Sequence, residues 1–162
     1  MDELAKTLGA RLRHASEILA TAESCTGGWA AQVVTSVAGS SAWFERGFVT
    51  YSNEAKQELL GVRAETLRAH GAVSEETARE MARGALERSR ATVSVSITGV
   101  AGPAGGTPEK PVGTVCFAWA RAGEVRSETR RFGGDRESIR RQSVILALEG
   151  VMRALDGAPD GG

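Results

Sequence analysis

The sequence has few of the side chains that most often carry metal or acid–base chemistry. Its only histidines, His14 and His70, are far apart in the chain and lack the spacing of metal ligands. Its two cysteines, Cys25 and Cys116, show neither a zinc-site spacing nor a disulfide pattern. We therefore predict no metal and no cofactor, and neither histidine is placed to serve a Ser-His-Asp triad.

An excess of positive charge and a long apolar run are also missing. Lysine plus arginine and aspartate plus glutamate number 20 each, so the formal net charge is zero. Nucleic-acid binding through phosphates needs excess positive charge, so we expect no nucleic-acid partner. No apolar run approaches the ~20 residues that span a bilayer, and the first 15 residues lack the apolar region of a signal peptide. We expect a cytoplasmic protein without membrane contact.

Helical and strand patterns alternate along the chain. Helical patterns cover residues 4–15, 29–37, 53–60, 63–69, 74–87 and 136–155, with Asn53 and Ser74 as expected N-caps. Strand patterns cover residues 18–22, 47–51, 92–97, 112–120 and 124–132, and the last two predict a hairpin. This order predicts a three-layer α/β/α fold around a central mixed sheet of about five strands. We expect one domain over residues 3–156 and a flexible tail at 157–162, because the sequence DGAPDGG has little to bury.

Three polar or glycine-rich loops follow predicted strands. They cover Glu23–Gly28, Ser52–Lys56 and Thr98–Gly106. In open α/β sheets, sites form at the carboxyl ends of strands, so we expect these loops to converge. Backbone N–H groups in glycine-rich turns can bind phosphate, although tight structural turns explain the glycines equally well.

Lysine is scarce, because Lys6, Lys56 and Lys110 are the only three and 17 arginines carry the remaining positive charge. A lysine can act as a base when burial or a neighbouring cation lowers its pKa, whereas arginine cannot deprotonate. Lys56 follows the second predicted strand, so its side chain can face the cleft expected between the converging loops. From spacing alone, a solvated helix lysine remains the alternative for Lys56, and an ordinary turn residue the alternative for Ser41. Cys25, which precedes a helix, is a further candidate nucleophile.

Six segments then match a known pattern in order. They are TAESCTGGW (21–29), AGSSAWFERGFVTYSNEAK (38–56), HGAVSEETA (70–78), TGVAGPAGG (98–106), KPVGTV (110–115) and FGGDR (132–136). Together they resemble the CinA C-terminal domain family, and especially its stand-alone members, the PncC-type nicotinamide-nucleotide amidohydrolases. The resemblance covers residues 4–155.

The resemblance implies hydrolysis of the carboxamide of nicotinamide mononucleotide to nicotinate mononucleotide and ammonia, in pyridine nucleotide salvage. It implies a Ser-Lys mechanism in which Ser41, the second serine of AGSSAWF, is the nucleophile and Lys56 is the base. It places Tyr51 beside them as a possible proton relay, with Ser24 and Thr98 as hydroxyl donors.

The resemblance also implies substrate-binding residues. Arg136 matches the family's phosphate-binding arginine best, with Arg140 as the alternative. Backbone amides of the two glycine-rich loops are expected to bind the substrate, at Gly27, Gly28, Gly99 and Gly102. Family members are commonly oligomeric, so a homodimer is favoured. The competing hypothesis is a non-catalytic nucleotide-sensing or interaction domain linked to competence or DNA damage, which would not require a base.

Overall fold

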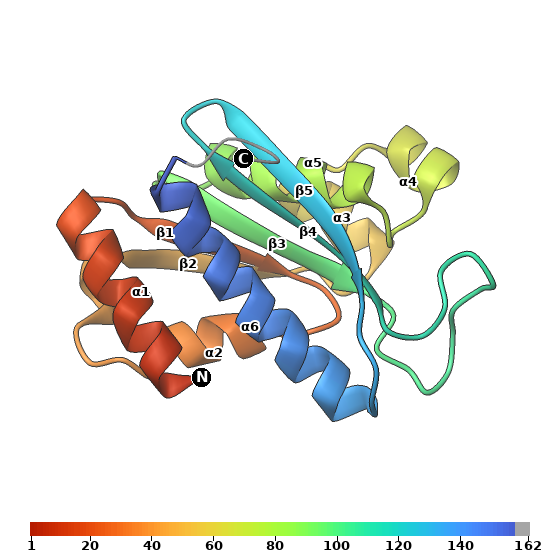
Figure 1. Ribbon diagram of the computed structural model, residues 1–162. Helices are drawn as coiled ribbons and strands as arrows, with labels where there is room; N and C mark the ends of the chain where they lie inside the picture. The colour runs from red at the N-terminus through yellow and green to blue at the C-terminus, as the bar shows by residue number, and fades with distance from the viewer. Residues whose placement is uncertain (158–162) are drawn as a thin grey trace.

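Five strands form one mixed sheet in the order β2-β1-β3-β4-β5 (Figure 1). The strands are β1 (Leu19–Glu23), β2 (Phe44–Val49), β3 (Val93–Gly99), β4 (Thr114–Arg121) and β5 (Glu124–Arg131). Strand β1 runs parallel to β2 and β3, whereas β4 runs antiparallel to β3 and β5. This computed structural model describes residues 1–157, so all but the first residue of the predicted 157–162 tail lies outside the described residues.

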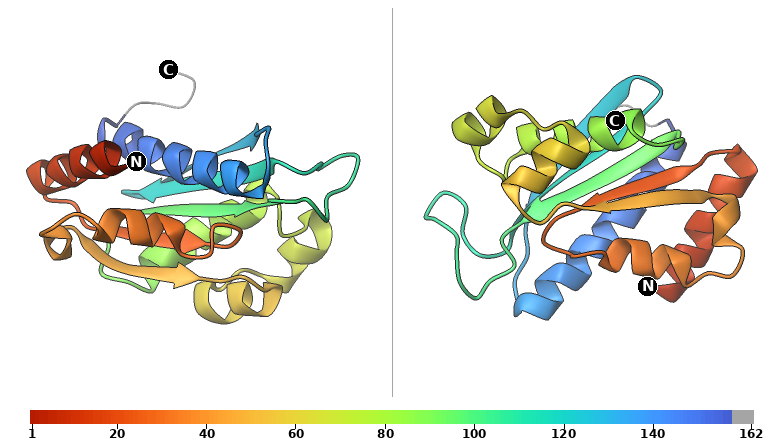
Figure 2. Two further views of the ribbon diagram at one scale, coloured as in Figure 1. Left: turned by 90° about the horizontal axis from the view of Figure 1, so that it is seen from below. Right: turned by 180° about the vertical axis from the view of Figure 1, so that it is seen from behind.

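Helices cover both faces of the sheet (Figure 2). One face carries α1 (Asp2–Ala15), α2 (Trp29–Thr35) and α6 (Arg136–Leu155), and the other carries α3 (Asn53–Leu60), α4 (Ala64–His70) and α5 (Glu75–Glu87). The predicted three-layer α/β/α fold with a mixed sheet of five strands is therefore confirmed. Among residues 1–157, every helix is too short or too polar to cross a membrane.

Strand β3 shows how a strand with alternating polarity is buried on both faces. Its apolar residues, such as Val95, face the layer of α1, α2 and α6. Its serines face α5, where Ser94 Oγ donates to the Ala82 carbonyl at 2.7 Å and Ser96 Oγ donates to the Ala78 carbonyl at 2.6 Å. Because each buried hydroxyl has a partner, the polar face costs little and α5 packs directly on the sheet.

The start of α3 is fixed by Ser52 and not by Asn53. The Ser52 hydroxyl accepts a hydrogen bond from the Ala55 N–H at 3.0 Å, whereas Asn53 is the first helical residue. The expected cap is therefore corrected by one position. The expected cap of α5 is confirmed, because Ser74 Oγ accepts from the Thr77 N–H. The N-cap at Ser52 fixes the position of Lys56 in the first turn of α3, because the Lys56 N–H donates to the Ser52 carbonyl.

Strand β2 begins earlier than its sequence pattern predicts. The prediction covered residues 47–51, and the strand covers Phe44–Val49. It is an edge strand with a register shift opposite Leu19 and Ala20, and its half-buried Glu45 and exposed Arg46 interrupt the apolar pattern. As a result, Ser41 lies in a short 3₁₀ turn, η1 (Ser40–Ala42), immediately before the strand.

The three predicted loops do converge at the carboxyl ends of the parallel strands. Strands β1, β2 and β3 are parallel, so the segments after them emerge at the same end (Figure 1). Backbone hydrogen bonds join these ends, from the Ser24 N–H to the Ile97 carbonyl at 2.9 Å and from the Thr50 N–H to the Glu23 carbonyl at 2.8 Å. The candidate site is built at this end.

Candidate active site

Lys56 is a deeply buried charged side chain at the carboxyl end of the sheet, with 1% of its surface exposed. Its Nζ lies 3.0 Å from Ser24 Oγ, 3.0 Å from the Thr50 carbonyl oxygen and 3.5 Å from the Tyr51 carbonyl oxygen. Helix α3 supplies the lysine, and the segments after β1 and β2 supply the three oxygens. The amine is therefore held between two parallel strands.

Burial changes the protonation of Lys56. Removal from water penalises the ammonium form, so the pKa of Lys56 falls below its ordinary 10.5, and interaction with Cys25 opposes this only partly. Within residues 1–157, no carboxylate forms a salt bridge with the Lys56 ammonium. The environment of Lys56 thus increases the fraction of neutral amine relative to an ordinary lysine, and the neutral amine is the form that can accept a proton.

Ser24 is the serine that the fold presents to Lys56. It is the first residue after β1, and its main chain is held by the Ile97 carbonyl and by the Gly27 N–H, which donates to the Ser24 carbonyl. Its side chain is buried but not sealed, with 7% exposed. The sequence assigned Ser24 a supporting hydroxyl, whereas the structure places its Oγ next to the Lys56 amine.

Ser41 lies at the other end of the sheet. It is exposed and precedes β2, whereas Lys56 follows β2. The six residues of this strand separate the two ends by roughly 20 Å at ~3.3 Å per residue. Within one chain, the parallel topology therefore brings Lys56 to Ser24 and keeps it away from Ser41. The nucleophilic role of Ser41 stays a prediction.

Tyr51 and Arg136 meet at the rim of the site. The Tyr51 side chain is 64% exposed, and its hydroxyl lies 3.4 Å from Arg136 Nη2. Arg136 Nη1 also donates to the Gly102 carbonyl at 2.8 Å. These contacts join the segments after β2 and β3 to the start of α6. The Tyr51 hydroxyl is directed to Arg136, while the Tyr51 carbonyl approaches Lys56.

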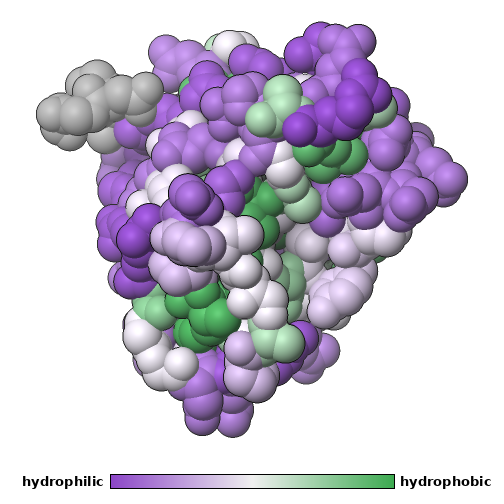
Figure 3. Space-filling view, turned by 90° about the vertical axis from the view of Figure 1, so that its right-hand side faces the viewer, coloured by the Kyte–Doolittle hydropathy of each residue, from purple (hydrophilic) through white to green (hydrophobic). Residues whose placement is uncertain are grey.

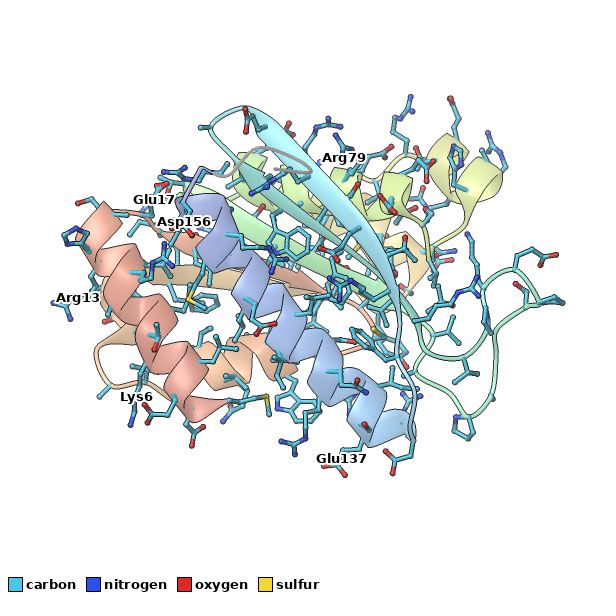
Figure 4. All side chains as sticks on the ribbon, viewed as in Figure 1. Lys6, Arg13, Glu17, Arg79, Glu137 and Asp156 are labelled. Carbon is cyan, nitrogen blue, oxygen red and sulfur yellow. The ribbon has the colours of Figure 1, made fainter. Side chains whose placement is uncertain are left out.

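Arg140 supports the turn after β1. Its Nε donates to the Cys25 carbonyl at 3.0 Å and its Nη2 donates to the Thr26 carbonyl at 3.1 Å, and the guanidinium stacks 5.5 Å from the centre of the Trp29 ring. An open cavity of about 750 Å³ adjoins this turn, lined by Thr26, Gly27, Gly28, Trp29, Gln32, Glu137 and Arg140. Glu137, labelled in Figure 4 near the start of α6, marks its margin.

Thr98 and the glycines after β3 form the other wall. Thr98 is buried, and its hydroxyl donates to the Ala72 carbonyl at 2.9 Å, which ties β3 to the turn before α5. A Cβ on Gly99 would lie 2.9 Å from the Thr114 carbonyl oxygen, so only glycine fits beside β4. Gly102 has a φ of +76°, which favours glycine. The substrate-binding role predicted for these glycines stays a prediction.

Figure 3 views the molecule onto the end that carries these groups. Pale and apolar residues occupy the hollowed middle of this face, and hydrophilic residues form its margins. A site of this kind has an apolar interior with a few polar groups, which is typical of small-molecule sites.

The structure does not support a cysteine nucleophile. Cys25 is buried, and burial raises the pKa of its thiol to about 12, so the thiolate is scarce at neutral pH. Throughout residues 1–157, histidine, cysteine, aspartate and glutamate side chains nowhere gather in threes that could hold a metal ion.

Sequence reasoning named Ser24 as a supporting hydroxyl but not as the serine nearest to Lys56, and it missed two buried groups nearby. The Glu23 carboxylate is buried beside Ser24, and the buried Thr50 hydroxyl has no hydrogen-bond partner among the described residues. The position of Ser24 after one strand and of Lys56 after its parallel neighbour is the pattern that could have indicated the pair.

Comparison with known proteins agrees with the motifs. The CinA C-terminal domain model matches residues 1–155. The chain is 57% identical over 148 residues to the nicotinamide-nucleotide amidohydrolase PncC of Escherichia coli strain K12, covering 91% of this chain and 90% of that protein. It is 53% identical over 150 residues to PncC of Pseudomonas putida, covering 93% and 94%.

Solved structures share the fold. The competence/damage inducible protein CihA from Agrobacterium tumefaciens aligns with a TM-score of 0.92 at 50% identity, covering 96% of this chain and 94% of that chain. A CinA superfamily protein from Klebsiella pneumoniae 700603 aligns with a TM-score of 0.93 at 40% identity, covering 97% and 98%. The family match spans nearly the whole chain and both sequence and structure agree, so this chain belongs to the CinA C-terminal domain family.

Proposed function

We propose that this chain is a nicotinamide-nucleotide amidohydrolase that converts nicotinamide mononucleotide to nicotinate mononucleotide and ammonia, in pyridine nucleotide salvage. The names of its PncC relatives support the substrate. The observation that carries the chemistry is the 3.0 Å contact between Ser24 Oγ and the buried Lys56 Nζ. In this proposal Ser24 replaces Ser41 as the nucleophile, and Lys56 keeps its predicted role as the base.

The surroundings of Lys56 orient its lone pair. A neutral amine has two N–H groups and one lone pair. The carbonyl oxygens of Thr50 and Tyr51 can only accept hydrogen bonds, so they take the two N–H groups. The remaining position of the nitrogen faces Ser24 Oγ, where the lone pair can accept the hydroxyl proton.

The reaction then has two halves. Ser24 Oγ attacks the carboxamide carbon while its proton passes to Lys56 Nζ. The C–N bond breaks, the Lys56 ammonium protonates the leaving nitrogen, and ammonia departs from an ester on Ser24. Neutral Lys56 next takes one proton from water while the water oxygen attacks the ester carbon. That proton returns to Ser24 Oγ as the C–O bond to the serine breaks, and the carboxylic acid product leaves and loses its remaining proton to solvent. Backbone N–H groups of the turns after β1 and β3 are the available oxyanion donors.

Arg136 is the better placed arginine for the nucleotide phosphate. It stands at the rim beside the exposed Tyr51 side chain, whereas Arg140 already donates to two carbonyls inside the turn. A planar guanidinium at an open rim suits a phosphate. The homodimer, the cytoplasmic location and the lack of a nucleic-acid partner stay predictions.

Ammonia release from nicotinamide mononucleotide, without added metal, tests the proposal. The wild-type protein is expected to turn over, and Ser24→Ala is expected to lose at least about a thousand-fold in kcat. Ser41→Ala is the matched control and is expected to keep most of the activity, because it is exposed at the other end of the sheet. Nucleotide binding by wild type without turnover would instead favour a sensing domain.

A further inference from the structure

The Glu23 side chain is a buried carboxylate directly before the proposed nucleophile, and it plays no part in the reaction above. Only 1% of Glu23 is exposed. Its Oε1 accepts hydrogen bonds from Thr26 Oγ1 at 2.6 Å and from the Ala30 N–H at 2.9 Å, and its Oε2 accepts from the Ala31 N–H at 3.0 Å. One side chain thus holds both the turn after β1 and the first residues of α2.

These three bonds are what makes the buried carboxylate tolerable. Within residues 1–157, no lysine, arginine or histidine forms a salt bridge with Glu23. A buried carboxylate without partners is very costly, so the N–H groups of Ala30 and Ala31 and the Thr26 hydroxyl must stay in place around it. The carboxylate and the geometry of the turn therefore depend on each other.

The alternation of side chains along β1 links this anchor to Ser24. Consecutive residues of a strand point to opposite faces. Glu23 points to the layer of α2, and Ser24 points to the layer of α3, where Lys56 lies. The Glu23 carbonyl also accepts from the Thr50 N–H, which precedes the carbonyl that holds Lys56 Nζ. The Glu23 side chain is therefore hydrogen-bonded to the turn that follows Ser24, and the Glu23 carbonyl is hydrogen-bonded to the residue whose own carbonyl holds Lys56.

We propose that Glu23 is a positioning residue, whose carboxylate anchors the turn after β1 to α2 and so holds Ser24 Oγ within hydrogen-bonding distance of Lys56 Nζ. The inference rests on the proposed Ser24–Lys56 chemistry. Glu23 itself is directed away from Lys56 and touches no reacting atom. Its effect on catalysis passes through the position of Ser24.

Glu23→Gln tests this with little change in volume. The amide oxygen can still accept from Thr26 and Ala30, but the amide NH₂ cannot accept from the Ala31 N–H. We expect kcat to fall by about ten-fold to a hundred-fold with little change in KM, since small displacements of reacting groups cost this much. We also expect the pKa of Lys56 to rise toward 10.5, because a loosened turn admits water.

Glu80→Gln is the matched control. Glu80 performs the same task at α4, where its carboxylate accepts from the Arg63 N–H at 2.9 Å and from Thr66 Oγ1. It lies outside the candidate site. Its loss can lower stability, but it is expected to leave kcat and the pKa of Lys56 unchanged.

The pKa of Lys56 can be read directly, because the chain has only three lysines. Protein labelled with ¹³C at lysine Cε gives three titrating signals, and Lys56→Arg identifies the one from Lys56. This measurement requires no turnover. If wild type releases no ammonia, the proposed function fails, yet the titration of wild type and Glu23→Gln still tests whether Glu23 positions the pair.

A second variant keeps the test decisive if Glu23→Gln does not fold. Thr26→Val removes only the hydroxyl donor to Oε1, and Thr26→Ser restores it. We expect Thr26→Val to shift kcat and the Lys56 titration in the same direction as Glu23→Gln by a smaller amount, and Thr26→Ser to recover wild-type values. Unchanged kcat and unchanged Lys56 titration in the folded variants would overturn the proposal.

Discussion

The two ends of the parallel strands differ in what they bury. The carboxyl end buries the polar side chains of Glu23, Ser24 and Lys56, whereas the amino end buries the apolar ring of Trp43 and leaves Ser41 exposed. Buried polar groups reduce stability unless each has a partner, so a fold retains them where they serve a purpose. The difference agrees with the proposal that catalysis takes place at the carboxyl end, whereas the amino end serves packing.

Replacing Lys56 should produce the largest effect. Lys56→Met keeps an unbranched buried chain but removes the base, so kcat is expected to fall by at least about a thousand-fold. Lys6→Met is the control, because Lys6 is exposed on α1 and forms a surface ion pair with Glu3 (Figure 4). Ammonia release in steady state measures both. Substantial turnover by Lys56→Met would show that catalysis does not depend on the buried lysine at the carboxyl end.

Loss of Arg136 should affect substrate binding more than turnover. Arg136→Ala removes the guanidinium at the rim that is proposed to bind the phosphate. KM is expected to rise roughly ten-fold to a hundred-fold, which is the usual effect of losing one hydrogen bond between charged groups. Arg130→Ala, on β5 and paired with Glu128, is the matched control. The same KM increase in both variants would mean that general positive charge, and not this site, attracts the substrate.

The pH dependence should follow the neutral form of Lys56. Burial lowers the pKa of Lys56, so its neutral fraction grows at a lower pH than for an ordinary lysine. Below that pKa, kcat/KM is expected to rise about ten-fold per pH unit and then to level off at a midpoint below 10.5. Rates from pH 6 to 10 with substrate-only blanks test this. A flat profile would argue against a lysine base.

A change at the amino end should affect stability without affecting catalysis. Trp43 is buried against Gly9, where an added Cβ would lie 2.6 Å from the indole ring. Trp43→Ala is expected to lower the free energy of unfolding by about 3–5 kcal/mol. Denaturant unfolding gives this value, and kcat of the folded fraction should change by less than about two-fold. A large loss of kcat would show that the amino end contributes to the site.

The sequence predicted the layers and the convergence of the loops, because interleaved patterns and strand ends are local features. The bounds of α6 and the end of α3 were predicted correctly, since clear helical segments end at these positions, whereas the N-cap of α3 was misplaced by one residue. The sequence did not show that Ser41 and Lys56 lie at opposite ends of β2, because proximity in sequence says nothing about which end of a strand a residue occupies. The role inferred for Glu23 could not be predicted either, because the sequence ATAESCTGG does not reveal which layer the carboxylate faces.

The most direct test of the account is to locate the ester formed during turnover. The protein is mixed with nicotinamide mononucleotide, quenched in acid during steady state, digested and analysed by mass spectrometry. We predict a nicotinate mononucleotide adduct on Ser24, absent from Ser24→Ala and present in Ser41→Ala. An adduct on Ser41 or Cys25, or turnover that persists in Ser24→Ala, would contradict the assignment of the carboxyl end as the catalytic site.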